Sequence, residues 1–188
     1  MTAERKHNSR RGFTLAETLV TVLILAMVSS IVAAGIPAAK RAYEKVVISA
    51  NAEVLLSTSV ASLRNQLALA EKVTAEEDGK SLSFYSGSGI NAKIFPDAEN
   101  GGNIMLQEYI GYEGGSGQET AVRPLVPEAA STEDLYVTYD QASCSGRLVT
   151  IRGLGVYRRS QAESGSGPVT SVDTLNIRVI GNRKSEDE

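Results

Sequence analysis

The sequence predicts an α+β protein in which a long N-terminal helix packs on an antiparallel β-sheet. Three observations carry this prediction. An uncharged apolar run covers residues 18–39, a helical hydrophobic period continues from there to near Val73, and short segments with alternating hydrophobicity follow Asp78. A period near 3.6 favours helix and a period of 2 favours strand, so the change of period marks the boundary between the two parts.

The apolar run, Thr18 to Ala39, is long enough to cross a membrane. As a helix it spans about 33 Å, and the hydrocarbon core of a bilayer is about 30 Å thick. It exceeds the apolar region of an ordinary secretory signal peptide, which needs about 7–15 residues. A signal peptide cut near residues 32–35, and a plain single-pass anchor with one acid near its end, are the alternatives. The basic residues before the run are expected to stay in the cytoplasm, so the remainder lies outside.

The helix is predicted to continue beyond the apolar run as an amphipathic second half. No Gly or Pro interrupts residues 38 to 78, and apolar residues recur in steps of mostly three and four. The stripe expected to face the sheet is Tyr43, Val46, Val47, Ala50, Val54, Leu56, Val60, Leu63 and Leu67. One helix from Phe13 to near Val73 is the expectation, with a kink at Gly35 and Pro37 because proline removes a helical hydrogen bond.

The part after Asp78-Gly79 is expected to form short antiparallel strands with one buried face. The predicted strands are residues 81–86, 103–110, 134–140, 147–153, 154–160 and 174–181. Residues 135–140 and 147–152 are expected to pair as a hairpin across a surface turn that contains Cys144. Residues 162–167 are expected to form a flexible loop, and residues 128–135 a short helix or capping turn.

The stretch GFTLAE, residues 12–17, stands directly before the apolar helix and closely resembles the processing site of type IV prepilins and pseudopilins. The resemblance implies cleavage between Gly12 and Phe13 by a prepilin peptidase and N-methylation of Phe13. A glycine suits the cut site because it lets a protease approach the backbone. The resemblance further implies that Glu17 meets the ammonium group of Phe13 of a neighbouring subunit, which makes Glu17 the predicted assembly residue. An ionised carboxylate in such an apolar segment costs free energy unless a partner compensates its charge.

Four parts are therefore expected along the chain. They are a cleaved basic leader at residues 1–12, a membrane and filament-core helix at 13–39, an amphipathic helical half at 40–73, and a β-rich pilin domain at 74–188 with an acidic tail. Loss of the leader changes the net charge from −3 to −6.

The resemblance implies a structural subunit of a type IV pilus-like filament, stored in the cytoplasmic membrane and then assembled at the cell surface. Its expected partners are identical subunits, the prepilin peptidase, an assembly platform with its ATPase, and the membrane. The alternatives are a minor pilin or a pseudopilin of a type II secretion or DNA-uptake apparatus. A membrane-anchored enzyme or ligand-binding domain is an alternative of a different class.

No catalytic residue, cofactor or metal is expected. The only histidine, His7, lies in the leader, and no phosphate loop, nucleophile elbow or HExxH motif is present. The stretch from Asp97 to Asn103 only loosely echoes a calcium loop and lacks its closing glutamate. Arginines gather in the last third, but the negative net charge opposes binding of nucleic acid, and no specific nucleic acid is expected. The single cysteine, Cys144, excludes an internal disulfide.

Overall fold

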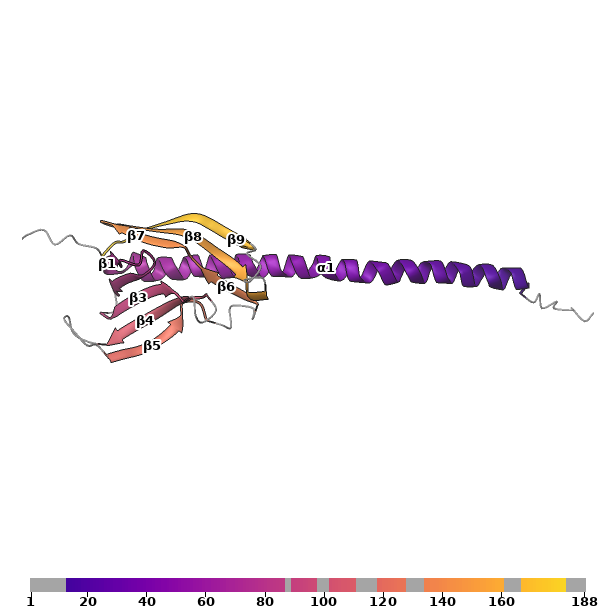
Figure 1. Ribbon diagram of the computed structural model, residues 1–188, viewed down its shortest axis with the longest axis horizontal. Helices are drawn as coiled ribbons and strands as arrows, with labels where there is room; N and C mark the ends of the chain where they lie inside the picture. Colours follow the sequence, from indigo (N-terminus) through magenta and orange to yellow (C-terminus); the bar gives the residue numbers. More distant parts are fainter. Residues whose placement is uncertain are drawn as a thin grey trace, which may run out of the picture. The chain divides into compact units, whose positions relative to one another are not determined.

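The computed structural model confirms the predicted α+β class. It describes residues 13–86, 89–97, 102–110, 118–127, 134–160 and 167–181. The chain divides into two compact units, Met1–Val46 and Val47–Glu188. Helix α1, Leu15–Ala68, begins in the first unit and ends in the second, and the β-strands of the second unit follow it (Figure 1).

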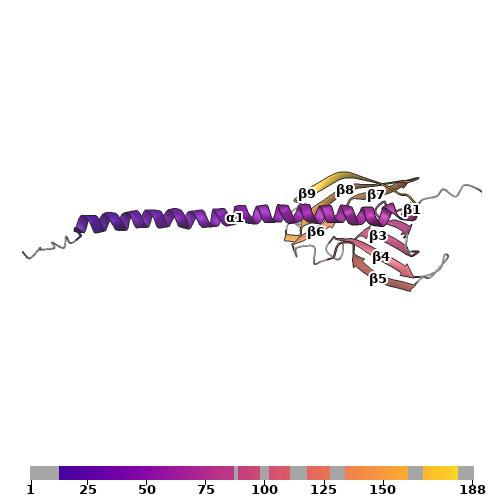
Figure 2. The same cartoon turned by 180° about the vertical axis from the view of Figure 1, so that it is seen from behind.

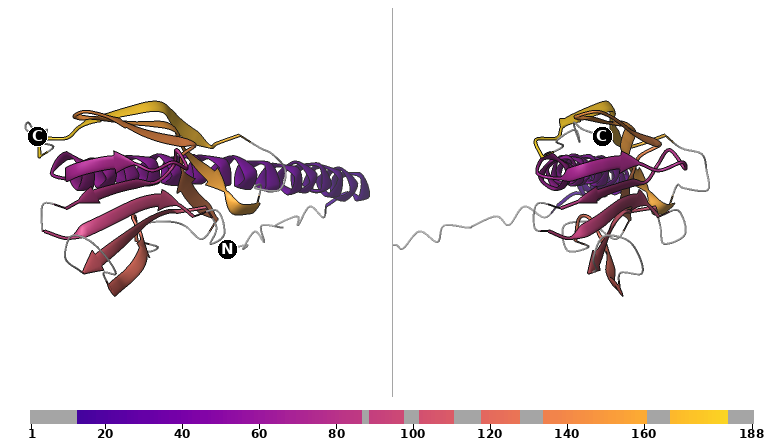
Figure 3. Two further views of the ribbon diagram at one scale, coloured as in Figure 1. Left: turned by 60° about the vertical axis from the view of Figure 1, so that its left-hand side comes forward. Right: turned by 90° about the vertical axis from the view of Figure 1, so that its left-hand side faces the viewer.

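Two sheets, rather than the single sheet expected, make up the second unit within the described residues. The first is an antiparallel meander of strands in chain order: β1 (Glu71–Ala75), β2 (Leu82–Tyr85), β3 (Asn91–Pro96), β4 (Ile104–Ile110) and β5 (Gln118–Pro124). The second contains β6 (Leu135–Thr138), β7 (Gln141–Ser145), β8 (Leu148–Arg158) and β9 (Thr170–Arg178). Figures 2 and 3 show both sheets beside the C-terminal part of α1.

Strand β8 organises the second sheet because it pairs with all three of its other strands. Its first half pairs with β7, from Gln141↔Arg152 to Ser145↔Leu148. Its second half pairs with β6, from Leu135↔Arg158 to Thr138↔Gly155. Strand β9 pairs along its other edge. Residues 135–145 and 148–158 thus form one long bent hairpin.

This pairing corrects the predicted hairpin. Residues 135–138 pair with 155–158 and not with 147–152, and the expected turn around Cys144 is strand β7. The two strands predicted at 147–153 and 154–160 are the single strand β8. Residues 161–166, which hold most of the predicted loop, and residues 128–133 of the predicted capping turn lie outside the described residues.

The helix ends earlier than expected, at Ala68, and Glu71 to Val73 belong to β1. The segment that follows β9 contacts this end, because the amide of Ile180 donates a hydrogen bond to the carbonyl of Ala68 at 2.9 Å. A side chain on the next residue, Gly181, would come within 2.7 Å of the carbonyl oxygen of Ala70. Long-range contacts of this kind leave no signal in the local sequence.

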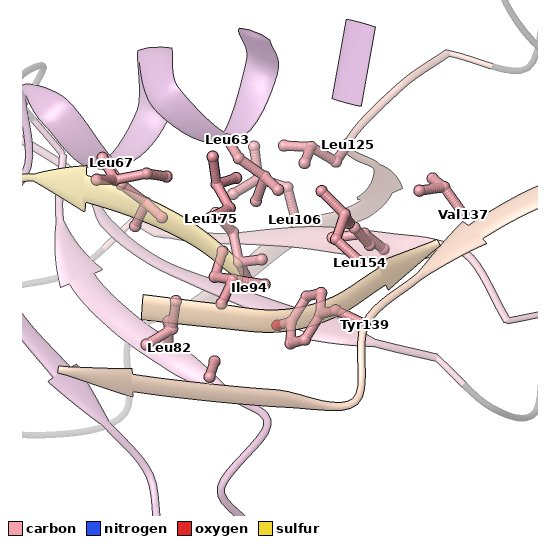
Figure 4. Close-up of a cluster of buried hydrophobic side chains, with 14 of the residues drawn as sticks. Leu63, Leu67, Leu82, Ile94, Leu106, Leu125, Val137, Tyr139, Leu154 and Leu175 are labelled. Atoms are coloured by element: carbon pink, nitrogen blue, oxygen red, sulfur yellow. The ribbon is translucent and has the colours of Figure 1, made fainter. Parts of the chain in front are cut away.

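The core lies between the C-terminal part of α1 and the inner faces of both sheets (Figure 4). The buried residues of α1 are Ala52, Leu55, Leu56, Ser59, Leu63 and Leu67. The hydroxyl of Ser59 donates to the carbonyl of Leu55 at 2.7 Å, so the one polar member is satisfied. Each buried Leu contributes about 1.5–3 kcal/mol by removal from water.

Only the second part of the predicted helical stripe is correct. Leu56, Leu63 and Leu67 are buried, whereas Tyr43, Val46 and Val54 are 71%, 67% and 61% exposed. Ala50 is exposed too, and Val47 and Val60 are half-buried. Val54 lies about 200° around the helix from Ala52, at 100° per residue, so it faces away from the core.

The turn between β1 and β2 is built around the carboxylate of Asp78. Its Oδ1 accepts the amides of Lys80 and Ser81 at 2.8 and 2.7 Å, and its Oδ2 accepts the Ser81 hydroxyl. The carbonyl of Lys80 in turn accepts the buried Tyr139 hydroxyl at 2.6 Å, and the carbonyl of Gly79 accepts the amide of Ala142 at 2.8 Å. The turn therefore connects the two sheets.

Acid is expected to destabilise the fold through this turn. The Ser81 side-chain and backbone hydrogen bonds lower the pKa of Asp78 to about 2. Because a depressed carboxyl pKa stabilises the folded state only above the unfolded value, about 3.9, this contribution disappears as the pH falls from about 4 to 2. The hydrogen bond from Lys93 also lowers the pKa of Glu76, which adds to the effect in the same direction.

The thermal midpoint of the detergent-solubilised full chain should therefore fall between pH 4 and pH 2. Asp78→Asn should lower the midpoint at pH 7 and flatten this decline. Glu77→Gln is the matched control. Glu77 is the exposed neighbour of Asp78, and its side chain forms no hydrogen bond or ion pair in the described part of the chain. An equal acid slope in wild type and Asp78→Asn would contradict the assignment.

Candidate processing and assembly segment

The predicted processing site leads directly into α1, and Thr14 caps that helix. The Thr14 hydroxyl oxygen accepts the amide of Glu17 at 3.3 Å, and the Thr14 carbonyl accepts the amide of Thr18 at 3.2 Å. Threonine followed three residues later by glutamate is the capping-box pattern, which satisfies amides that a helix start leaves without partners. Sequence reasoning missed this role of Thr14, although the T-x-x-E spacing is a usable signal.

Glu17 lies in the first turn of α1 and is exposed. An acid in the first turn interacts favourably with the helix dipole. It has no ion-pair partner among the described residues, and the ammonium partner that the resemblance implies belongs to another subunit. Its assembly role therefore remains a prediction.

The N-terminal part of α1 exposes nearly all its apolar side chains. Phe13 is 74% exposed and Leu15 83%, and the most apolar stretch of the helix has no buried residue. By length and composition this helix can cross a membrane. Exposed apolar area of this extent is a surface that requires lipid or protein to cover it.

The few hydroxyl groups in this segment are satisfied within the helix. Thr18 donates to the carbonyl of Leu15 at 2.8 Å, Thr21 to that of Glu17 at 2.7 Å, and Ser30 to that of Met27 at 2.8 Å. Because a lipid environment offers no hydrogen-bond partners, such internal pairing suits an apolar medium.

The family model of the prokaryotic N-terminal methylation motif matches residues 7–33. The chain carries a type IV prepilin-like signature. The match includes the end of the basic leader, the predicted cleavage site, Glu17 and residues 18–33 of the apolar run. No curated protein and no solved structure matches the chain.

The prepilin-like signature supports processing of this chain as a precursor of the type IV pilin or pseudopilin kind, and the apolar helix fits a membrane-anchored protein. Gly12 lies outside the described residues, whereas Phe13 is described and exposed. The predicted cleavage and methylation sites stay predictions. Pro37 lies inside α1, which is helical from Leu15 to Ala68, and the kink at Gly35 and Pro37 is likewise still a prediction.

The other sequence candidates form no second site in the described part of the prepilin-like chain. No group of three or more His, Cys, Asp or Glu residues there is arranged to hold a metal ion. The amide of Asp97 donates to the carbonyl of Asn103 at 2.9 Å, which closes a loop whose residues 98–101 are not described. The thiol of Cys144 donates to the carbonyl of Val73 at 3.3 Å and joins β7 to β1, and partial burial raises its pKa.

Proposed function

We propose that the chain is a structural subunit of a type IV pilus-like extracellular filament, and that it has no enzymatic activity. The observation that supports this most is the methylation motif at the head of a long apolar helix whose side chains are exposed. Cleavage after Gly12 leaves Phe13 as the first residue, directly before the Thr14 cap. Burial of such helices against one another replaces lipid contacts with protein packing.

In this proposal the second unit is the outward-facing part of the subunit. Its core is closed by α1 and the two sheets without any unsatisfied buried side chain in the described residues. Because the second unit has its own closed core, the subunit can be extracted from the membrane while this unit stays folded. The prepilin peptidase, an assembly platform with its ATPase and identical subunits are the partners that the proposal requires.

Glu17→Gln separates assembly from processing. Glutamine at this position keeps the capping-box chemistry but removes the charge, so the helix start is retained. Loss of one member of a desolvated charge pair costs about 3–5 kcal/mol, so filament in the sheared cell-surface fraction should fall at least tenfold. The mature chain should still begin at N-methyl-Phe13 by mass spectrometry.

Glu53→Gln is the matched control, because Glu53 is an exposed acid later in the same helix and has no ion pair within the described ranges. It should assemble normally. Normal filaments from Glu17→Gln would refute the assembly role of Glu17.

A minor pilin or pseudopilin of a secretion or DNA-uptake apparatus would share every feature of the first unit. Abundance distinguishes the two: a major subunit dominates the sheared surface fraction of wild-type cells, whereas a minor subunit or pseudopilin is a trace component of it.

A further inference from the structure

Thr14 stands between the predicted cut site and the first residue of α1. Phe13 and Thr14 are not helical, and α1 begins at Leu15. The hydroxyl oxygen of Thr14 accepts the amide of Glu17 at 3.3 Å, and its carbonyl accepts the amide of Thr18 at 3.2 Å. A residue that accepts both bonds is an N-cap, and it marks where the helical backbone begins. Only two residues therefore separate the helix from the predicted cut.

The Thr14 hydroxyl binds an amide that would otherwise extend the helix toward the cut. In an α-helix each amide bonds to the carbonyl four residues earlier. The Glu17 amide would then bond to the carbonyl of Phe13, and the amide of Ala16 would bond to the carbonyl of Gly12. Because Thr14 itself accepts the Glu17 amide, the helical hydrogen bonds stop before they reach Gly12.

The carbonyl of Gly12 is the group that a peptidase must attack at this cut. Hydrolysis adds water across the bond and leaves a carboxylate on Gly12 and an ammonium on Phe13. An enzyme stabilises the oxygen of an attacked carbonyl with its own hydrogen-bond donors, so this oxygen must be free of other donors. A Gly12 carbonyl that accepted a helical amide would be a poorer substrate. On the other side of the bond, Phe13 is 74% exposed.

The surroundings of the segment favour extension of the helix if the cap is lost. The helix α1 continues into a stretch that is apolar and long enough to cross a membrane. A backbone amide without a partner costs several kcal/mol in such a medium, so an uncapped Glu17 amide is expected to bond to the Phe13 carbonyl. Gly12 would then become the N-cap, which a glycine tolerates, and its carbonyl would accept the Ala16 amide.

We propose that Thr14 is a positioning residue for the processing reaction. Its cap ends the helix before the Gly12–Phe13 bond and keeps that bond accessible to the peptidase. This inference rests on the processing step in the proposed function, and it adds a residue that acts through the backbone and not by contact with the reacting atoms.

Cleavage of the detergent-solubilised full chain by purified prepilin peptidase tests this role. Thr14→Ala should lower kcat/KM about fivefold, which is the effect of one N-cap on a helix equilibrium. Thr14→Ser and Thr14→Asn should be cut at least as fast as wild type, because both residues are good N-caps of different shape. Thr21→Ala is the matched control and should be cut as wild type, since the Thr21 hydroxyl donates to the carbonyl of Glu17 at 2.7 Å and caps no amide.

The carbonyl carbon of Phe13 gives a readout that does not depend on the peptidase. Its NMR chemical shift in detergent should move toward the helical value in Thr14→Ala and stay at the wild-type value in Thr14→Ser. Slow cleavage of Thr14→Asn would show that the peptidase contacts Thr14 directly, and it would overturn the proposal. An unchanged rate in Thr14→Ala, or slow cleavage without the Phe13 shift, would overturn it as well. If the wild-type chain is not cut at all, the processing step fails and the positioning role fails with it.

Discussion

Replacement of Gly12 with valine is expected to leave the leader almost entirely uncut. A peptidase that cleaves after this residue must bring its catalytic groups against the backbone, and a β-branched side chain obstructs that approach and stiffens the chain. Mass spectrometry of the membrane fraction should find a chain that begins at Met1 or Thr2, whereas wild type is expected to begin at N-methyl-Phe13. Without the free ammonium at Phe13, filament in the sheared fraction should be lost as well.

The control for this experiment is Ala3→Val, which places the same side chain inside the leader but away from the cut. It should be processed as wild type. A Gly12→Val chain that still begins at Phe13 would show that cleavage does not depend on this glycine. It would leave the methylation motif at residues 7–33 without the processing step assigned to it.

The features near the N-terminus were predictable because their signals are local. The length of an uncharged run can be read directly from the sequence, and the residues GFTLAE identify a prepilin-like signature within six positions. The same holds for β2 and β4, where predicted and observed strands differ by a residue or two. Local pattern and final structure agree wherever one residue's environment is set by its sequence neighbours.

Two of the strands that were not predicted, β1 and β7, have weak or broken patterns. In β1 only Val73 is buried, and in β7 only Ala142 is buried, so neither presents an apolar face that the sequence can reveal. Both lie at the seam between the sheets, where Cys144 bonds to the carbonyl of Val73. By contrast, Ala92 and Ile94 of β3 do alternate and were a usable signal.

The sequence predicted two strands in place of β8 because the buried positions of β8 change from odd-numbered to even-numbered residues. Val149 and Ile151 are buried in its first half, whereas Leu154 and Val156 are buried in its second. The same change occurs between Tyr139 and Ala142 on the neighbouring strands. From sequence alone this break at Gly153 resembles a turn. In the structure Gly153 lies at a bend of the strand. Before the bend the odd-numbered residues face the core, and after it the even-numbered residues do.

Gly153→Ala should be among the most destabilising single substitutions in the folded unit. Gly153 has a φ of +66°, a left-handed conformation that costs a residue with a side chain about 1–2 kcal/mol. A Cβ there would also lie 2.1 Å from Oδ2 of Asp140, so a second penalty of about 1–3 kcal/mol is added. Together they should lower the thermal midpoint of the detergent-solubilised chain by about 5–15 °C.

Two further variants separate the backbone penalty from the steric one. Gly146 has a similar φ of +60° but open space where its Cβ would lie, so Gly146→Ala should show only the backbone cost. Asp140→Gly in the Gly153→Ala background removes the obstructing carboxylate and should recover the steric part. If Gly146→Ala and Gly153→Ala lower the midpoint equally, Asp140 does not pack on this bend. The parity change of β8 then depends on the left-handed glycine alone.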